Sequence, residues 1–299
     1  MRVISLFPGA TDAIIALGGA DLLVGASHAC DLDQSLAVIP RVTAPAVDAT
    51  DQSGAIDAAI RKMAAAGRPL FALDEARIVS LAPDLIITQA LCNVCAVGET
   101  DVRTLAGRMV PVPRVVSISG TTLEAVFGDI ATIGAAIGFA SESDELLLGL
   151  RRRMRTVHDT LKAAHAPRPR VAVIEWADPM YAGGHWVPEQ VARAGGIDVL
   201  ATAGTHSAVV TAEQVRDAAA DVVLVAPCGF DVGRATEEAA HLISAHPWLG
   251  AAHVWAIDAD SLTSRPGPHL VDGIEVMARI FAPLLFSPDD SALARRIGG

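Results

Sequence analysis

Residues that bind metals or react as nucleophiles fall in a few short segments of this chain. Cys92 and Cys95 are two residues apart, a spacing typical of zinc sites, redox dithiols and plain packing alike. His28 and Cys30 form a second donor pair, and Cys228 adds a fourth thiol. Thiolates and imidazoles are ligands of zinc, and thiolates hold iron–sulfur clusters. Small buried thiols lining a pocket are the alternative. The candidate metal ligands are Cys30, Cys92, Cys95 and Cys228.

A second set of residues has the properties of a pocket for a flat apolar ligand. Only 4% of the chain is aromatic, yet Trp176, Tyr181 and Trp186 lie close together around Gly183-Gly184. Aromatic faces bind apolar rings, and glycine lets a ligand approach the backbone. Core packing under loops is the alternative for the tryptophans. The candidate ligand-binding residues are Phe7, Pro8, Gly9, His28, Trp176, Tyr181, Gly184, His185, Trp186, Phe230 and Arg265.

Most of these residues follow predicted strands. Short apolar runs alternate with helical patterns, which predicts parallel α/β sheets. We expect strands at residues 2–7, 22–27, 70–73, 84–89, 114–118, 170–176, 221–225 and 254–257. In open α/β sheets, ligands lie beyond the carboxyl ends of the strands. All four cysteines, the single tyrosine and two of the four tryptophans follow such ends, so we predict that they line one cleft.

A long helix is predicted between the two halves of the chain. Residues 141–165 are amphipathic, with acidic residues in the first turn and basic residues later, and Ser141 or Ser143 is the expected N-cap. At about 1.5 Å per residue, this helix would be roughly 35–40 Å long. We therefore predict two Rossmann-like α/β lobes with parallel sheets joined by one long α-helix. The expected boundaries are residues 1–140, 141–166 and 167–299.

Composition and charge argue against several classes of protein. The chain has 299 residues and a net charge of −11, and no basic cluster is interleaved with aromatics, which argues against nucleic-acid binding. No apolar run approaches the roughly 18 residues of a membrane span, so we expect no membrane insertion. The first residues do not form a signal peptide. This predicts a cytoplasmic protein as the sequence stands, or a periplasmic or extracellular one if a leader was removed.

Sequence motifs of common enzymes are absent. The chain has no Walker A loop, no Gly-x-Gly-x-x-Gly after the first strand, no His-Glu-x-x-His and no Gly-x-Ser-x-Gly. The absence of these motifs does not exclude an enzyme, but nothing in the sequence argues for one, and we expect a protein that is not an enzyme.

Several segments resemble a known family. Residues 2–12, 16–18, 23–25 and 81–88 resemble the signatures of cobalamin- and siderophore-binding proteins of ABC importers, a class III periplasmic-binding-protein-like family. The likeness covers nearly the whole chain, including the long helix. It implies two α/β lobes with limited hinge motion and a small-molecule ligand between them. In exported members it also implies delivery to ABC transporter membrane subunits.

A narrower resemblance involves the cysteines. Residues 27–31, 91–95, 175–176, 184–189 and 265–268 are similar to a leaderless, cysteine-containing subgroup that is usually labelled cobalamin-binding. Exported cobalamin receptors generally lack this cysteine set. The resemblance implies cobalamin, a related corrinoid or another metal-containing cofactor as the ligand.

The resemblance also implies roles for individual residues. Apolar contacts to the macrocycle would come from Phe7, Trp176 and Trp186. An axial ligand, or a hydrogen bond to a ligand side chain, would come from His28 or His185.

Polar groups of the ligand would meet Arg265 and the backbone amides near Gly9 and Gly184. The alternative for Arg265 is an ion pair with Asp178 or Asp260.

Two other hypotheses start from the thiols. One is a cytoplasmic metalloprotein or enzyme with a Cys/His-bound metal, zinc or an iron–sulfur cluster, in the same cleft. The other is a redox protein that uses Cys92 and Cys95 as a dithiol.

Overall fold

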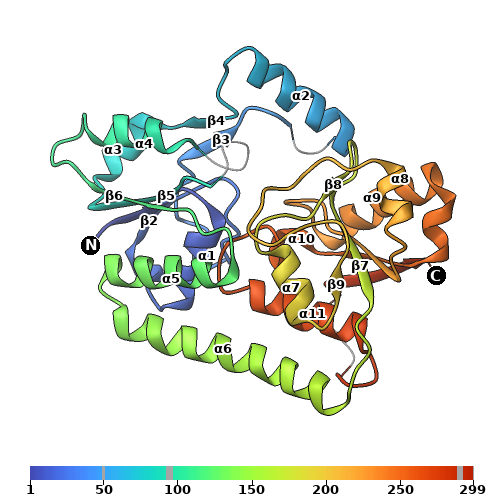
Figure 1. Ribbon diagram of the computed structural model, residues 1–299. Coiled ribbons are helices and arrows are strands. Elements are labelled where there is room, and N and C mark those ends of the chain that lie inside the picture. Colours follow the sequence, from blue (N-terminus) through green and yellow to red (C-terminus); the bar gives the residue numbers. More distant parts are fainter. Residues whose placement is uncertain (49–50, 92–96, 288–291, 299) are drawn as a thin grey trace.

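The N-terminal lobe is built on a four-stranded parallel sheet in the order β2-β1-β5-β6. Its strands are β1 (Val3–Ser5), β2 (Leu23–Ala26), β5 (Leu85–Gln89) and β6 (Arg114–Ile118). The central strands β1 and β5 are buried along their whole length, as expected for a parallel sheet covered on both faces. Figure 1 shows the fold of this computed structural model, which describes residues 1–48, 51–91, 97–287 and 292–298.

Helices cover both faces of this sheet. They are α1 (Pro8–Ala16), α3 (Glu75–Leu81), α4 (Glu99–Ala106) and α5 (Leu123–Ile137), and a short 3-10 helix, η1 (Ala20–Leu22), precedes β2. Alternate residues of a strand point to opposite faces. Val3 and Ile87 accordingly pack with α1 and α5, whereas Ile4 and Ile86 pack with α3 and α4.

The C-terminal lobe has a mixed sheet in the order β12-β11-β10-β7-β8, with β9 paired to β7. Its parallel centre consists of β7 (Arg170–Trp176), β10 (Val222–Val225) and β11 (His253–Ile257), joined by the short β9 (Ile197–Asp198). Two antiparallel strands, β8 (Tyr181–Ala182) and β12 (Ala294–Gly298), lie at its edges. The predicted fold class is confirmed, with these antiparallel edges as an addition.

Helices also cover both faces of the second sheet. Val171 and Leu224 share an apolar cluster with α7 (Val187–Arg193) and α11 (Leu270–Phe281). Ala172 and Val223 face the opposite way, toward the following helices: α8 (Ala212–Asp217) and α9 (Val232–Ala245). Two short helices complete the lobe, η2 (Pro247–Ala251) and α10 (Ala259–Leu262).

One long helix, α6 (Ala140–Ala163), joins the two lobes and runs along the bottom of Figure 1. Its buried residues Leu147, Leu150 and Val157 belong to an apolar cluster that continues into both lobes. Arg153 forms ion pairs with Asp272 and Glu275 of α11. The lobes therefore share a packed core on this side of the molecule.

The predicted N-cap of this helix was wrong. The N-cap is Phe139, which makes no side-chain capping bond, and Ser141 lies inside the helix. Ser143 donates its hydroxyl to Ala140 O and packs against Gly134. The reason is the tight connection from α5: Gly138 ends α5 in the left-handed conformation, so the chain enters α6 before either serine.

A small two-stranded antiparallel sheet is separate from the first sheet. It consists of β3 (Thr43–Pro45) and β4 (Phe71–Leu73), and the segment between these strands extends away from the lobe. This segment carries α2 (Ser53–Ala65), drawn at the top of Figure 1 on the side opposite α6. Among the described residues, no helix combines the length and hydrophobicity needed to cross a bilayer.

The connection between α5 and α6 can be tested with two glycines. Gly138 has a φ of +86°, whereas Gly128 lies inside α5, and a Cβ at either position would meet open space. Gly138→Ala should lower the free energy of unfolding by about 1 kcal/mol, because an L side chain strains the left-handed conformation. Gly128→Ala should raise it by up to about 1 kcal/mol, because alanine is the better helix former. Urea unfolding followed by circular dichroism measures both; shifts of the same sign would contradict this account.

Candidate functional site

Arg265 is the centre of a charged cluster where the lobes meet. Its side chain is 7% exposed and contacts Asp260 in its own lobe. From the other lobe, Asp31 Oδ2 lies 2.5 Å from Nη2 and Asp12 Oδ2 lies 3.8 Å from Nη1. Of the two ion pairs considered from the sequence, the one with Asp260 is formed. Arg265 therefore connects the lobes, and a ligand group would compete with three carboxylates for it.

Burial controls the protonation of this cluster. Desolvation raises the pKa of Asp12 despite the opposing charge of Arg265, and desolvation likewise raises the pKa of Asp260. Burial works to lower the pKa of Arg265, but its bonds to Asp260 and Asp31 together raise it. Asp12 Oδ2 is buried and has no hydrogen-bond partner within the described parts of the chain. The guanidinium therefore stays charged and holds the acids of both lobes around it.

Next to this cluster the two backbones touch. A Cβ on Gly9 would lie 2.4 Å from the carbonyl oxygen of Pro266, so only glycine allows this approach. Gly9 follows Pro8, the first residue of α1, and Phe7, the N-cap. Phe7 is 4% exposed and belongs to the apolar core. Of these three predicted ligand residues, Gly9 therefore touches the other lobe, Phe7 is buried in the core, and Pro8 begins α1.

The predicted aromatic surface divides into a buried part and a half-exposed part. Trp186 is 4% exposed, and its Nε1 donates to Thr263 O at 2.8 Å. Phe230 is equally buried, and its ring meets Trp176 edge-on at 5.3 Å between centroids. Trp176 and Tyr181 are both half-buried and pair across β7 and β8. Trp176 and Tyr181 thus present the accessible aromatic surface in this structure.

Glu175, just before Trp176, organises the backbone around Gly184. Its carboxylate accepts hydrogen bonds from Gly184 N at 2.9 Å and from Ser207 Oγ at 2.8 Å. A Cβ on Gly184 would lie 2.4 Å from Ser207 N, so the loops pack backbone to backbone. Burial raises the pKa of Glu175. The backbone N–H of Gly184, predicted to meet a polar group of the ligand, therefore donates to Glu175 of its own lobe in this structure.

His185 combines an unusual backbone with a histidine partner. It has a φ of +53°, the left-handed region that non-glycine residues rarely adopt. Its Nε2 lies 3.0 Å from Nδ1 of His206. Burial, and secondly His206, lowers the pKa of His185. His185 is therefore neutral at physiological pH, the form of imidazole that binds a metal.

His28 lies in the other lobe, after β2. Its Nδ1 is 2.7 Å from Thr43 Oγ1, and its ring stacks on Phe71 at 5.5 Å between centroids. Burial, followed by the charge of Arg41, lowers the pKa of His28. This histidine is also neutral near pH 7, and Thr43 orients its ring.

The described cysteines do not form a metal site with their neighbours. Cys30 is buried with Sγ 3.0 Å from Thr11 Oγ1, and Cys228 is half-buried. Burial raises the pKa of Cys30 to about 11, so this residue is a neutral thiol near pH 7. Within the described residues, no three His, Cys, Asp or Glu side chains are arranged to hold a metal ion. Cys92 and Cys95 lie outside these residues, and the site with all four thiols stays a prediction.

Sequence reasoning missed several residues that join the lobes. Glu189 Oε2 accepts a hydrogen bond from Leu123 N at 2.6 Å, and Glu238 accepts two from Ser53. Asp12 and Asp31 bind Arg265. Asp12, Asp31 and Glu189 lie inside segments that carry the family resemblance, whereas Glu238 sits in an ordinary polar context in the sequence. His206 was also missed, and the one signal for it in the sequence is its residue type, since imidazole is a common metal ligand.

Two α/β lobes joined by one helix, with strand-end loops in contact, define a two-lobed binding protein. The periplasmic binding protein family model matches residues 3–251, so the chain belongs to this family. It is accordingly a substrate-binding protein rather than an enzyme. No curated protein sequence matches the chain.

Solved structures with the same fold span the whole chain. A periplasmic heme binding protein from Pseudomonas aeruginosa has a TM-score of 0.72 and 20% identity, covering 99% of this chain and 97% of that one. The periplasmic heme binding protein HutB of Vibrio cholerae has a TM-score of 0.70 and 18% identity, covering 95% and 99%. The periplasmic vitamin B12 binding protein BtuF of Vibrio cholerae has a TM-score of 0.63 and 20% identity, covering 94% and 96%.

The neutral state of Cys30 has a direct chemical consequence. In the folded protein at pH 8, iodoacetamide should modify Cys30 at least about tenfold more slowly than Cys228, because the thiolate is the nucleophile and burial suppresses it. Mass mapping of the labelled peptides gives the two rates. In urea the rates should converge. Equal rates in the folded protein would show that Cys30 is an accessible thiolate.

Proposed function

We propose that this protein binds a metal-containing macrocycle, a corrinoid such as cobalamin or a heme, between its lobes. We further propose that it delivers this ligand to the membrane subunits of an ABC importer, from the periplasmic side. The observation that carries the proposal is the half-exposed pair Trp176 and Tyr181 at the strand ends of the C-terminal lobe, with the neutral His185 on the same loop.

The chemistry of these side chains supports this class of ligand. Indole and phenol rings bind the flat apolar face of a macrocycle through area burial and ring contacts. A neutral imidazole binds iron or cobalt, and its orientation is set by the hydrogen bond at the other nitrogen or a neighbouring group. Nε2 of His185 lies within hydrogen-bond distance of His206 Nδ1. If Nε2 bound the metal of the ligand, this hydrogen bond would have to break.

The comparisons support the same ligand class from another direction. The related structures are described as proteins that bind heme or vitamin B12, and each aligns with almost the full chain. Both ligands are metal-containing macrocycles. His28, in the opposite lobe, is the second candidate for an axial contact, because its ring is neutral and held by Thr43.

Ligand titration tests the proposal directly. Hemin, cyanocobalamin and cobinamide should be titrated into the protein by absorbance and by calorimetry. We expect at least one of them to bind with a dissociation constant of about 1 μM or tighter, which corresponds to about −8 kcal/mol. Trp176→Ala should weaken that binding by about tenfold, because it removes the ring contact.

Trp248→Ala is the matched control. Trp248 is also half-buried but lies on η2, which precedes β11 and therefore sits at the opposite end of the strands. Its substitution should leave the affinity unchanged. No binding of any of the three compounds would refute the proposal.

A metal contact from His185 predicts a spectroscopic change. His185→Ala should shift the Soret and visible bands of the heme complex, because an imidazole ligand is replaced by water or by none. His241→Ala, an exposed position on α9, should leave the spectrum unchanged. Identical spectra for the wild type and His185→Ala would show that His185 is not the axial ligand. The titrations would still decide whether the protein binds the macrocycle.

A further inference from the structure

The helix α2 is attached to its own lobe by a narrow neck. The neck is the antiparallel pair of β3 and β4, in which Thr43 lies opposite Leu73 and Pro45 opposite Phe71. One further bond, from Ala46 N to Leu70 O at 2.9 Å, continues it. The chain therefore leaves for α2 and returns from it side by side.

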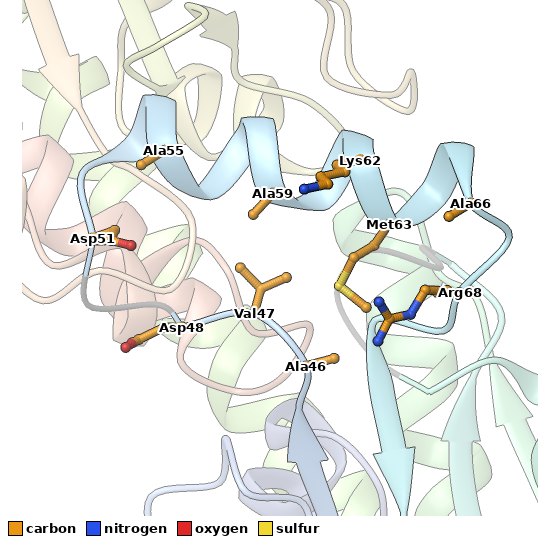
Figure 2. Close-up of a pocket in the computed structure, with 10 residues that line it drawn as sticks. All are labelled: Ala46, Val47, Asp48, Asp51, Ala55, Ala59, Lys62, Met63, Ala66 and Arg68. Atoms are coloured by element: carbon orange, nitrogen blue, oxygen red, sulfur yellow. The ribbon is translucent and has the colours of Figure 1, made fainter.

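Beyond the neck, α2 packs loosely. Of its residues only Ser53 and Ile56 are buried. The three apolar clusters formed by the described residues contain no residue of α2. A cavity of about 350 Å³ lies under α2. Figure 2 shows its lining residues on α2 and on the segment that carries Ala46 and Val47. Protein cores are close-packed, so a helix resting over such a space lacks the contacts that hold other helices in place.

The first turn of α2 is instead bound to the other lobe. Glu238 of α9 is 6% exposed and accepts hydrogen bonds from Ser53 N at 3.1 Å and from Ser53 Oγ at 2.7 Å. The N-cap residue of α2, Gln52, makes no side-chain capping bond. A carboxylate at a helix N-terminus binds its unsatisfied amides and interacts favourably with the helix dipole. Glu238 of the C-terminal lobe therefore caps the N-terminus of α2, a helix of the N-terminal lobe.

The helix α2 also contacts the half-exposed aromatic residues, through its first turn and through Arg61 further along. Trp176 Nε1 donates to Ser53 O at 3.2 Å, and Arg61 Nη2 lies 3.4 Å from the hydroxyl of Tyr181. A Cβ on Gly54 would lie 2.4 Å from Asp178 Oδ2, so the backbone of α2 approaches this surface closely. Access to Trp176 and Tyr181 from this side thus requires α2 to move.

We infer that α2 is a lid, which pivots on the β3–β4 neck and is latched to the C-terminal lobe by the contact between Ser53 and Glu238. Lifting the lid uncovers Trp176 and Tyr181. Apart from those of the buried Ile56, the contacts that break are polar, so water replaces them at modest cost, and none of the apolar clusters has to open. The role in ligand entry rests on the proposed function, whereas the latch itself does not.

Hydrogen exchange in the ligand-free protein tests the latch. Glu238→Gln removes the charge at constant size, and Glu238→Ala removes the side chain. Both should speed exchange of the α2 amides, and trypsin cleavage after Arg61 and Lys62, by about tenfold or more, the loss expected for hydrogen bonds to a charged group. Exchange in β1 and β7 should not change, which shows that the lobes stay folded. Glu237→Gln, at the exposed neighbouring position, is the matched control.

Stopped-flow mixing with hemin or cobinamide tests the role in entry. If α2 must lift first, the association rate constant should rise in the two Glu238 variants by about the same factor as exchange. The lid is refuted if the α2 amides of both variants exchange at the wild-type rate. It is also refuted if exchange becomes faster but the association rate constant does not change. If wild-type protein binds neither compound, the proposed function fails, and the exchange experiment still decides whether the latch exists.

Discussion

The guanidinium of Arg265 is buried between the two lobes, and a buried cation requires anions around it. Asp260 supplies one from the same lobe, and Asp12 and Asp31 supply two from the other. Separating the lobes here would leave the buried carboxylate of Asp12 without its counter-charge and Arg265 with Asp260 alone. The adjacent contact between Gly9 and Pro266 is too close to admit a side chain. Charge and shape therefore hold this part of the interface in one arrangement.

The interface is consequently asymmetric. On the side of α6, an apolar cluster continues from one lobe into the other, and opening it would expose hydrophobic surface. On the side of α2, the contacts are polar and few, and the helix rests over a cavity. Motion is therefore least costly at α2, and a ligand between the lobes would enter there without disturbing the shared core.

The fold by itself does not select the ligand. Structures described as binding heme and vitamin B12 share this architecture at about the same low identity. The choice must then lie in the side chains at the strand ends. Here burial keeps His28 and His185 neutral and Cys30 protonated, so the imidazoles, rather than this thiol, are the donors suited to the metal of the proposed ligand.

The sequence by itself determined the local elements and the class of fold. Apolar alternation and helical periodicity located the strands β1, β5, β6 and β7 and the long α6, because these patterns record which faces are buried. It also placed the distinctive residues at strand ends. What only the tertiary structure decided is which of them remain accessible. Trp186 and Phe230 are buried, whereas Trp176 is not fully covered, and no local pattern distinguishes them.

The contacts between the lobes could not be predicted from the sequence either. Ser53 and Glu238 are 185 positions apart, and each looks like an ordinary polar residue at a helix surface. The antiparallel β12 and the entry into α6 at Phe139 were missed for a related reason. Periodicity encodes burial along one segment, but the partner of a polar group across an interface depends on how two lobes are placed in space. That placement follows from the packing of α6 and the charges around Arg265.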